Sequence, residues 1–284
     1  PGTDGTCGAT IAVGTCTVVV TYTPTSSGTH NDTIQLSYND GYEDTNVYRG
    51  VTGVGLDPAS LAISDGATYD FGSHVLNTTS EKTFTITNSG DVSATSVAGS
   101  GLAAPYTFKG GSYPGTGGTC TTSIAVGTCT IVVSYTPTAA GTHNDTLQLD
   151  YNDGKDDQNT TRAFTGTGLS PASLAVSDGA TYDFGSKVLE TVTEKTFTIT
   201  NSGGVSATSV TGSSLSLPFR FKGESYPGTG GTCGATIAVG TCTVIVEYNP
   251  TVTGSHSDTL SLDYNDGASN QTATRALSGT GVNP

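Results

Sequence analysis

The feature that most constrains the fold of this chain is a long sequence repeat with a fixed period. The run PGTDGTCGATIAVGTCTVVVTYTP opens at Pro1, and closely related runs open at Pro114 and Pro227. A second run, PASLAISDGATYDFGS at Pro58, returns almost unchanged at Pro171. Repetition at a fixed period, here about 113 residues, indicates copies of one structural unit. The 284 residues therefore hold the second half of one repeat, followed by two whole repeats.

The repeat divides the chain into three expected units, which we number in chain order. Unit 1 (residues 1–56) is a second-half repeat, and units 2 (57–169) and 3 (170–284) are complete. We expect linkers at Leu56–Ser60 and Leu169–Ser173, because a proline there fixes φ and has no amide donor. Linkers this short predict an elongated array with limited bending.

Within one repeat the pattern is all β. Ser60–Ser64 and Lys82–Asn88 alternate apolar and polar residues with a period of two, as half-buried strands do. Turn clusters such as Asn152-Asp153-Gly154 separate such runs. Seven or eight short strands per repeat, without helical periodicity, predict a β-sandwich. The further strands expected in unit 2 are Thr95–Gly99, Pro105–Lys109, Thr121–Ile124, Thr130–Pro137, Thr146–Asn152 and Thr161–Thr167.

Apolar side chains on these runs supply one compact core for each complete repeat. In unit 2 we expect this core to contain ten residues: Leu61, Ile63, Phe71, Phe84, Ile86, Ile131, Val133, Leu147, Leu149 and Phe164.

Charge excludes several classes of partner. The net charge is −14, and only ten lysines and arginines are present. Nucleic-acid binding needs clustered basic residues, so we expect no nucleic-acid partner and no attraction to anionic membranes. No apolar run approaches the ~20 residues of a membrane span, so we expect no membrane insertion in this segment. The chain opens in a Gly/Thr-rich turn without a methionine or leader, and we expect it to be a piece of a longer protein.

The order of motifs in each repeat resembles a known family. DFGS, TFTITNSG, the run CTTSIAVGTCTIVVSYTPT, AGTHNDTLQL and a closing FTGTG follow one another in unit 2. This order is similar to the ASPM–SPD-2–Hydin type of immunoglobulin-like domain, and closest to the bacterial variety in choice-of-anchor D surface proteins. The resemblance implies tandem immunoglobulin-like sandwiches on an exported protein, used as spacers or interaction modules. It implies no catalytic residues.

Six cysteines form three pairs with eight residues between the partners: Cys7 and Cys16, Cys120 and Cys129, Cys233 and Cys242. No C-x-x-C motif occurs, so the ligand spacing of redox and zinc motifs is missing. The intervening IAVGT is typical of a hairpin turn that places the two cysteines opposite each other. We therefore predict the disulfides Cys7–Cys16, Cys120–Cys129 and Cys233–Cys242, with free thiols as the alternative. Disulfides predict an oxidising compartment, and hence an extracellular or cell-surface location.

Three histidines recur at one repeat position, each two residues before an aspartate: His30 with Asp32, His143 with Asp145, His256 with Asp258. The pairs fit either a metal or acid–base site or a structural role. We favour the structural role, because one His and one Asp per domain are too few ligands. His74 is replaced by Lys187 in the next repeat, which predicts an exposed position. No nucleophile motif or phosphate-binding loop is present, so we expect no enzyme and no catalytic, cofactor-binding or metal-binding residues.

Acidic loops leave calcium open as a ligand. One loop carries Asp40, Glu43 and Asp44, and its copy carries Asp153, Asp156 and Asp157. The third copy keeps only Asp266, and no D-x-[DN]-x-[DN]-G loop occurs, so a solvated loop is the favoured interpretation. Asp65 and Asp70, with their copies Asp178 and Asp183, fit turns and strand ends. The N-x-T sequons at Asn31, Asn77, Asn144, Asn159 and Asn270 leave glycosylation open.

Two classes of function fit these observations. The favoured hypothesis is a non-enzymatic stalk, fibre or filament on a bacterial cell surface, with the chain itself as partner through head-to-tail or lateral assembly. The alternative is an adhesin or receptor-binding module that recognises a glycan or a protein through its loops. Substitutions between repeats are spread over several stretches, including Ala103–Thr107 and Lys155–Thr160, which favours a scaffold.

Unit 1 lacks half of the strands of a repeat. We expect about four strands there, including Thr17–Thr23 and Thr33–Tyr38, with an apolar face and an unpaired edge. Three outcomes are open: an upstream continuation supplies the missing strands, a neighbouring molecule donates them, or the half-domain is free. We favour the first.

Overall fold

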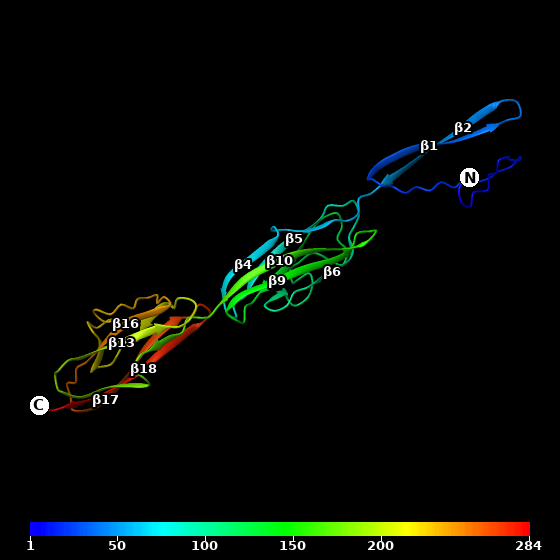
Figure 1. Cartoon of the computed structure of the whole chain (residues 1–284). Coiled ribbons are helices and arrows are strands. Elements are labelled where there is room, and N and C mark those ends of the chain that lie inside the picture. Colours follow the sequence, from blue (N-terminus) through cyan, green and yellow to red (C-terminus); the bar gives the residue numbers. More distant parts are fainter.

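The computed structural model describes residues 1–284 and contains strands but no helix. The strands form three bodies that follow one another in a line, with the two termini at opposite ends (Figure 1). The prediction of an elongated all-β array of immunoglobulin-like sandwiches is confirmed. No helix long and apolar enough to cross a membrane occurs in the chain.

Unit 2 is built from two four-stranded sheets. The first has the order β3-β5-β8-β7 and is antiparallel throughout. The second has the order β4-β10-β9-β6, in which β4 pairs parallel to β10. The bounds are β3 Leu61–Ile63, β4 Thr68–Val75, β5 Ser80–Asn88, β6 Thr95–Ser100, β7 Tyr106–Phe108, β8 Gly127–Tyr135, β9 Gly141–Asn152 and β10 Asp157–Leu169.

Unit 3 repeats this topology with the sheet orders β11-β13-β16-β15 and β12-β18-β17-β14. Its strands are β11 Leu174–Val176, β12 Thr181–Val188, β13 Thr193–Asn201, β14 Thr208–Gly212, β15 Phe219–Phe221, β16 Gly240–Tyr248, β17 Gly254–Asn265 and β18 Asn270–Val282. Between the two units, Ser170–Ser173 carry no ladder, although Leu169 still pairs with Val75 as the last residue of β10.

Two expectations about the strands of unit 2 are wrong. Strand β4 was not expected, because its alternation is interrupted at Gly72, which has a positive φ of 80° next to a shift of register against β10. Thr121–Ile124 is not a strand, and only Ile124 forms a bridge, to Ala94. It lies in the loop closed by the Cys120–Cys129 disulfide, which bends the chain away from a continuous ladder.

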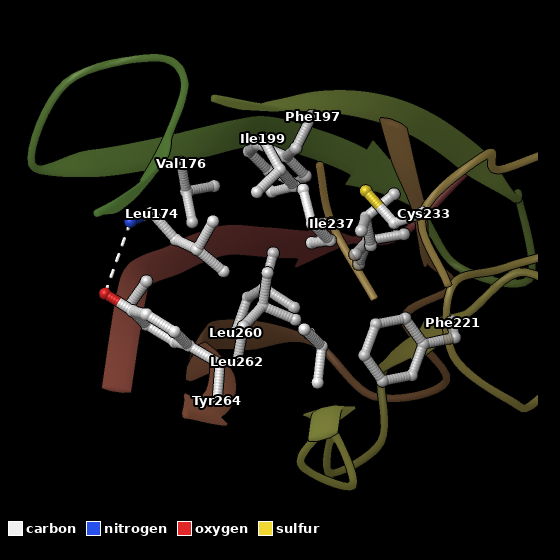
Figure 2. Close-up of a cluster of buried hydrophobic side chains, with 14 of the residues drawn as sticks. Leu174, Val176, Phe197, Ile199, Phe221, Cys233, Ile237, Leu260, Leu262 and Tyr264 are labelled. Atoms are coloured by element: carbon white, nitrogen blue, oxygen red, sulfur yellow. Dashed lines mark hydrogen bonds between the residues drawn. The ribbon is translucent and has the colours of Figure 1, made fainter. Parts of the chain in front are cut away.

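The ten core residues expected in unit 2 are all buried. Phe84 stacks on Phe164 with 5.2 Å between the ring centroids, which joins the facing sheets. Unit 3 has a separate core of the same kind, in which side chains of β11 and β13 face Leu260 and Leu262 of β17 (Figure 2). The Tyr264 hydroxyl there accepts a hydrogen bond from the Leu174 amide at 3.2 Å. Neither core includes residues of another unit.

Close packing against a buried tyrosine makes Gly166 sensitive to substitution. A Cβ atom at Gly166 would lie 2.8 Å from Cζ of Tyr135, a fully buried side chain. We expect Gly166→Ala to lower the free energy of unfolding of unit 2 by about 1–3 kcal/mol, because the enclosed ring has no space to move. Urea denaturation followed by tyrosine fluorescence measures this change.

The matched control is Gly53→Ala at the same repeat position in unit 1. The Tyr22 ring there also lies close to the added Cβ, at 2.6 Å from Cζ, but it is 48% exposed, so it has space to shift toward solvent. We expect little change in stability. Equal losses at the two positions would contradict the steric explanation.

Unit 1 contains one antiparallel hairpin, formed by β1 (Gly28–Asn39) and β2 (Asp44–Gly55). The prediction of a strand at Thr17–Thr23 is wrong, because these residues belong to no ladder. The equivalent strand of unit 2, β8, pairs with β5 and β7, which both come from the first half of a repeat. Unit 1 has no such strands, so the backbone groups of Thr17–Thr23 lack their sheet partners.

Candidate interaction surface

All three predicted disulfides are present: Cys7–Cys16, Cys120–Cys129 and Cys233–Cys242. No free cysteine remains. In units 2 and 3 the first cysteine of each pair is buried and belongs to the core. Each bond therefore joins the loop before a central strand to that strand. Three disulfides in one chain indicate a non-reducing, extracellular environment.

The repeated histidines hold hydrogen bonds inside each unit. His143 Nδ1 lies 2.9 Å from the hydroxyl of Tyr135, and the Tyr106 hydroxyl donates to the His143 carbonyl at 2.9 Å. Burial, followed by the charge of Asp70, raises the pKa of Tyr135 and keeps its phenol protonated. His30 and His256 make the same bond to Tyr22 and Tyr248.

The aspartates that follow these histidines bond to the backbone. Asp145 accepts hydrogen bonds from the amides of Thr146 and Ala103, and Asp258 accepts them from Thr259 and Ser216. Asp32 accepts one from Thr33. Position 74 was expected to be exposed, but His74 is half-buried, with Nε2 2.9 Å from the Phe71 carbonyl.

The acidic loops are closed by their own first aspartate. Asp153 accepts hydrogen bonds from the amides of Lys155 and Asp156 and from the Gln158 side chain, and Asp266 has the same arrangement. No three His, Cys, Asp or Glu side chains gather closely enough to hold a metal ion. Asp65 and Asp178 each pair with a lysine, Lys82 and Lys195 respectively. The five sequon asparagines are all exposed.

The closed loop at Asp153 predicts a specific response to acid. Hydrogen bonds from the Asp156 and Lys155 amides lower the pKa of the Asp153 carboxyl below its ordinary 3.8. Because the folded-state pKa is lowered, the carboxylate stabilises the fold above pH 4, and this contribution is lost as the pH falls through the lowered value. We expect the stability difference between the wild type and Asp153→Asn to shrink as the pH falls below about 4.

Urea denaturation at several pH values measures this difference. The matched control is Asp156→Asn, because Asp156 is exposed in the same loop and its side chain closes no turn. A difference for Asp153→Asn that stays constant from pH 7 to pH 2 would contradict the role of the carboxylate.

The most unusual surface of the molecule is an apolar face on unit 1, which we call the open face. It consists of Val18, Val20 and Tyr22 on the N-terminal segment and Leu36 and Tyr38 on β1. These side chains are between 38% and 54% exposed. At the equivalent positions of unit 2, four of the five side chains are 0% exposed and Tyr151 is 8% exposed. In unit 2 the strand that carries three of these positions, β8, is covered on both edges by strands β5 and β7, which belong to the first half of the repeat.

The open face is hollowed between the N-terminal segment and the hairpin. A groove of about 420 Å³ is lined by Val20, Tyr22, His30, Val51 and Gly53, among others. Two of its lining residues are hydrogen-bonded to each other, with the Tyr22 hydroxyl 2.7 Å from His30 Nδ1. The expected apolar face of unit 1 is therefore present, with a groove between the N-terminal segment and β1 and β2.

A second hollow, of about 480 Å³, lies on unit 3 and was not anticipated. Its lining includes Leu217, Arg220, Glu224 and Tyr226. The Arg220 guanidinium donates to the Glu247 carboxylate at 2.8 Å. Unit 2 has Thr107, Gly111 and Ser134 at the positions of Arg220, Glu224 and Glu247. The charged lining is therefore specific to unit 3.

Comparison with known proteins supports a Hydin-related immunoglobulin-like domain. Residues 175–279 match the family described as HYDIN/CFA65/VesB-like, Ig-like domain. This segment covers nearly all of unit 3. No curated protein matches the sequence.

The solved structures that match this chain have low sequence identity and low TM-scores. The Vibrio cholerae VesB protease is 15% identical, with a TM-score of 0.32, and the match covers 38% of this chain and 31% of that chain. The ASH/PapD-like domain 7 of human CEP192 is 16% identical, with a TM-score of 0.31, and covers 40% and 87%. Mouse PcdhgC3 EC1–3 is 10% identical, with a TM-score of 0.41, and covers 90% and 77%.

Proposed function

We propose that this chain is a non-enzymatic structural repeat segment of an extracellular protein, acting as a stalk or filament on a bacterial cell surface. The observation that carries the proposal is that each complete repeat closes its own core and that the repeats follow one another in a line. Length then grows with repeat number, which is what a spacer requires. The family resemblance to bacterial choice-of-anchor D surface proteins and the three disulfides support the location.

Small-angle X-ray scattering of the chain tests the spacer function. A compact domain of this length has a radius of gyration of about 19 Å. We expect a clearly larger value and the pair-distance distribution of a rod. A radius as small as that of the compact domain would overturn the proposal, as would reduced thiols in protein isolated from its natural source.

The hollow on unit 3 favours a second candidate function, glycan or protein binding through loops. Its aromatic and charged side chains are a combination that orients a polar ligand. The variant Arg220→Thr introduces the residue that unit 2 has at this position. Binding of the wild-type chain to a glycan array, together with loss of that binding in Arg220→Thr, would support this function. Retention of the same binding by Arg220→Thr would exclude the hollow as the site.

A further inference from the structure

We propose that the parallel pairing of β4 with β10 is a tension-bearing clamp, through which unit 2 resists being pulled apart along the array. In unit 3 the clamp is the pairing of β12 with β18. The proposal deepens the stalk function and rests on it for its biological role, because a stalk transmits pulling forces between its two ends. The load-bearing property itself belongs to each folded repeat and is measured on the chain alone.

Tension along the chain enters unit 2 ahead of β3 and leaves it at the end of β10. In the first linker the Ala59 amide donates to the carbonyl of Asp153, in the turn between β9 and β10, at 2.9 Å. The chain leaves the unit at Leu169, the last residue of β10. Strand β10 therefore spans the unit from one linker to the other, along the line of the array (Figure 1).

The connection to unit 3 adds no slack to this path. Leu169 pairs with Val75 of β4, and the carbonyl of the next residue, Ser170, accepts a hydrogen bond from the Gly204 amide of unit 3 at 2.9 Å. Val75 also lies against unit 3, where a Cβ atom added at Gly267 would be 3.0 Å from Cγ2 of the valine. A pull on unit 3 is therefore applied directly to the end of β10.

The parallel direction of β4 and β10 turns this pull into a shearing load. Six residue pairs join the two strands, from Thr68 with Ala163 to Val75 with Leu169. Tension draws β4 toward the first linker and β10 toward the second, so the strands are pushed to slide past each other. Their evenly spaced hydrogen bonds are then stressed together. Breaking several bonds at once needs a larger force than breaking them in succession, as happens when a strand pair opens from one end.

A buried arginine ties the other strand on the load path to β10. Arg162 of β10 is 6% exposed, and its guanidinium donates to the Ile63 carbonyl at the end of β3. Strand β3 itself pairs with β5 over only three residues. A hydrogen bond from a charged donor is stronger than one between neutral groups, and burial strengthens it further. The bond joins the first and the last strand of the unit across the two sheets.

Unit 3 repeats each of these features. Strand β12 pairs parallel to β18 over six residue pairs. The Arg275 guanidinium of β18 donates to the Val176 carbonyl of β11, and the Ala172 amide donates to the Asp266 carbonyl at 2.9 Å. Two units in series carry the same tension, so a clamp in only one of them would leave the other as the weak point. The presence of the same clamp in both units fits a load that passes through the whole array.

Pulling a single chain in an atomic-force microscope tests the proposal. With handles at the two termini, we expect one unfolding event from each complete repeat, and each event should lengthen the chain by about 300 Å. The second geometry has one handle at the N-terminus and one on Lys155→Cys, an exposed position in the turn between β9 and β10. The engineered thiol reacts alone, because the chain has no free cysteine.

The second geometry pulls unit 2 from one end only, so the β4–β10 pair opens bond by bond. We expect unit 2 to unfold at least about 10-fold faster at the same force than it does between the two termini, because each bond then breaks separately. Equal rates in the two geometries would overturn the proposal. An extended chain with equal rates would leave the spacer function in place, so the two failures are distinguishable.

The variant Arg162→Met removes the bond to β3 and keeps the apolar stem of the side chain. We expect unit 2 to unfold at least about 10-fold faster at the same force between the termini, while the unit 3 event stays unchanged as the internal reference. The comparison of pulling geometries keeps the original Arg162, so it decides the question even if Arg162→Met does not fold.

The matched control is Val97→Ala. Val97 is 2% exposed on β6, at the opposite edge of the sheet from β4 and off the load path. It should lower the stability of unit 2 in urea but change the forced-unfolding rate by less than about 2-fold, because the packing around β6 is still intact when the clamp yields. Equal acceleration by Val97→Ala and Arg162→Met would show that Arg162 acts only through general stability and would overturn the clamp.

Discussion

Replacing Phe84 with alanine is expected to lower the free energy of unfolding of unit 2 by about 3–5 kcal/mol while unit 3 keeps its stability. Phe84 is fully buried and joins the two sheets through Phe164 and Tyr69. Its removal leaves a cavity that the rigid sheets cannot close. Because the two cores share no residue, the loss should stay within one unit. Hydrogen exchange in increasing urea, resolved by peptide, measures the two units separately.

The matched variant Phe197→Ala should destabilise unit 3 and leave the stability of unit 2 unchanged, because Phe197 has the same position and burial in unit 3. A cooperative loss of both units in either variant would contradict independent folding. It would instead indicate that the unfolding of the two units is coupled through the contact between Val75 of unit 2 and Gly267 of unit 3.

Removing the disulfide of unit 2 through Cys120→Ala with Cys129→Ala is expected to cost about 2–3 kcal/mol of stability. The bond closes a short loop, and in the chain-entropy model a loop of about ten residues contributes this amount by restricting the unfolded state. The buried Cys120 side chain adds a packing contribution. Thermal unfolding of both forms at neutral pH measures the difference.

The matched control is the double variant Cys7→Ala with Cys16→Ala in unit 1. The Cys7–Cys16 disulfide lies in unit 1, and no residue of unit 1 belongs to the core of unit 2 or unit 3. Removing this disulfide should therefore leave the unfolding of units 2 and 3 unchanged. Loss of stability in unit 2 after removal of the unit 1 disulfide would contradict the separation of the units.

Periodic patterns in the sequence predicted most of the fold because they are local. The alternation of apolar and polar residues at Lys82–Asn88 predicts a strand with one buried face. The spacing of the cysteines predicts two chain segments that lie opposite each other. The ten predicted core residues of unit 2 are buried for the same reason. The repeat then extends each conclusion to unit 3 without further information.

Other features depended on partners distant in sequence. Arg162 is of a residue type normally found on the surface, and only the packing of β10 against β3 buries it next to the Ile63 carbonyl. Thr17–Thr23 has the alternation of a strand but no ladder, because a strand is stabilised by its neighbours rather than by its own pattern. The groove on unit 1 and the charged hollow on unit 3 likewise arise from segments that meet only in space.

The sequence by itself determined the all-β class, the period of the repeat, the three cysteine pairs and the side chains of the core. Each of these follows from spacing along the chain, which folding does not alter. The tertiary structure decided the parallel pairing of β4 with β10, the burial of Arg162 and Arg275, and the shape of the open face. Those depend on which strands become neighbours across large sequence separations, and hydrogen-bond partners and packing volumes exist only after that choice is made.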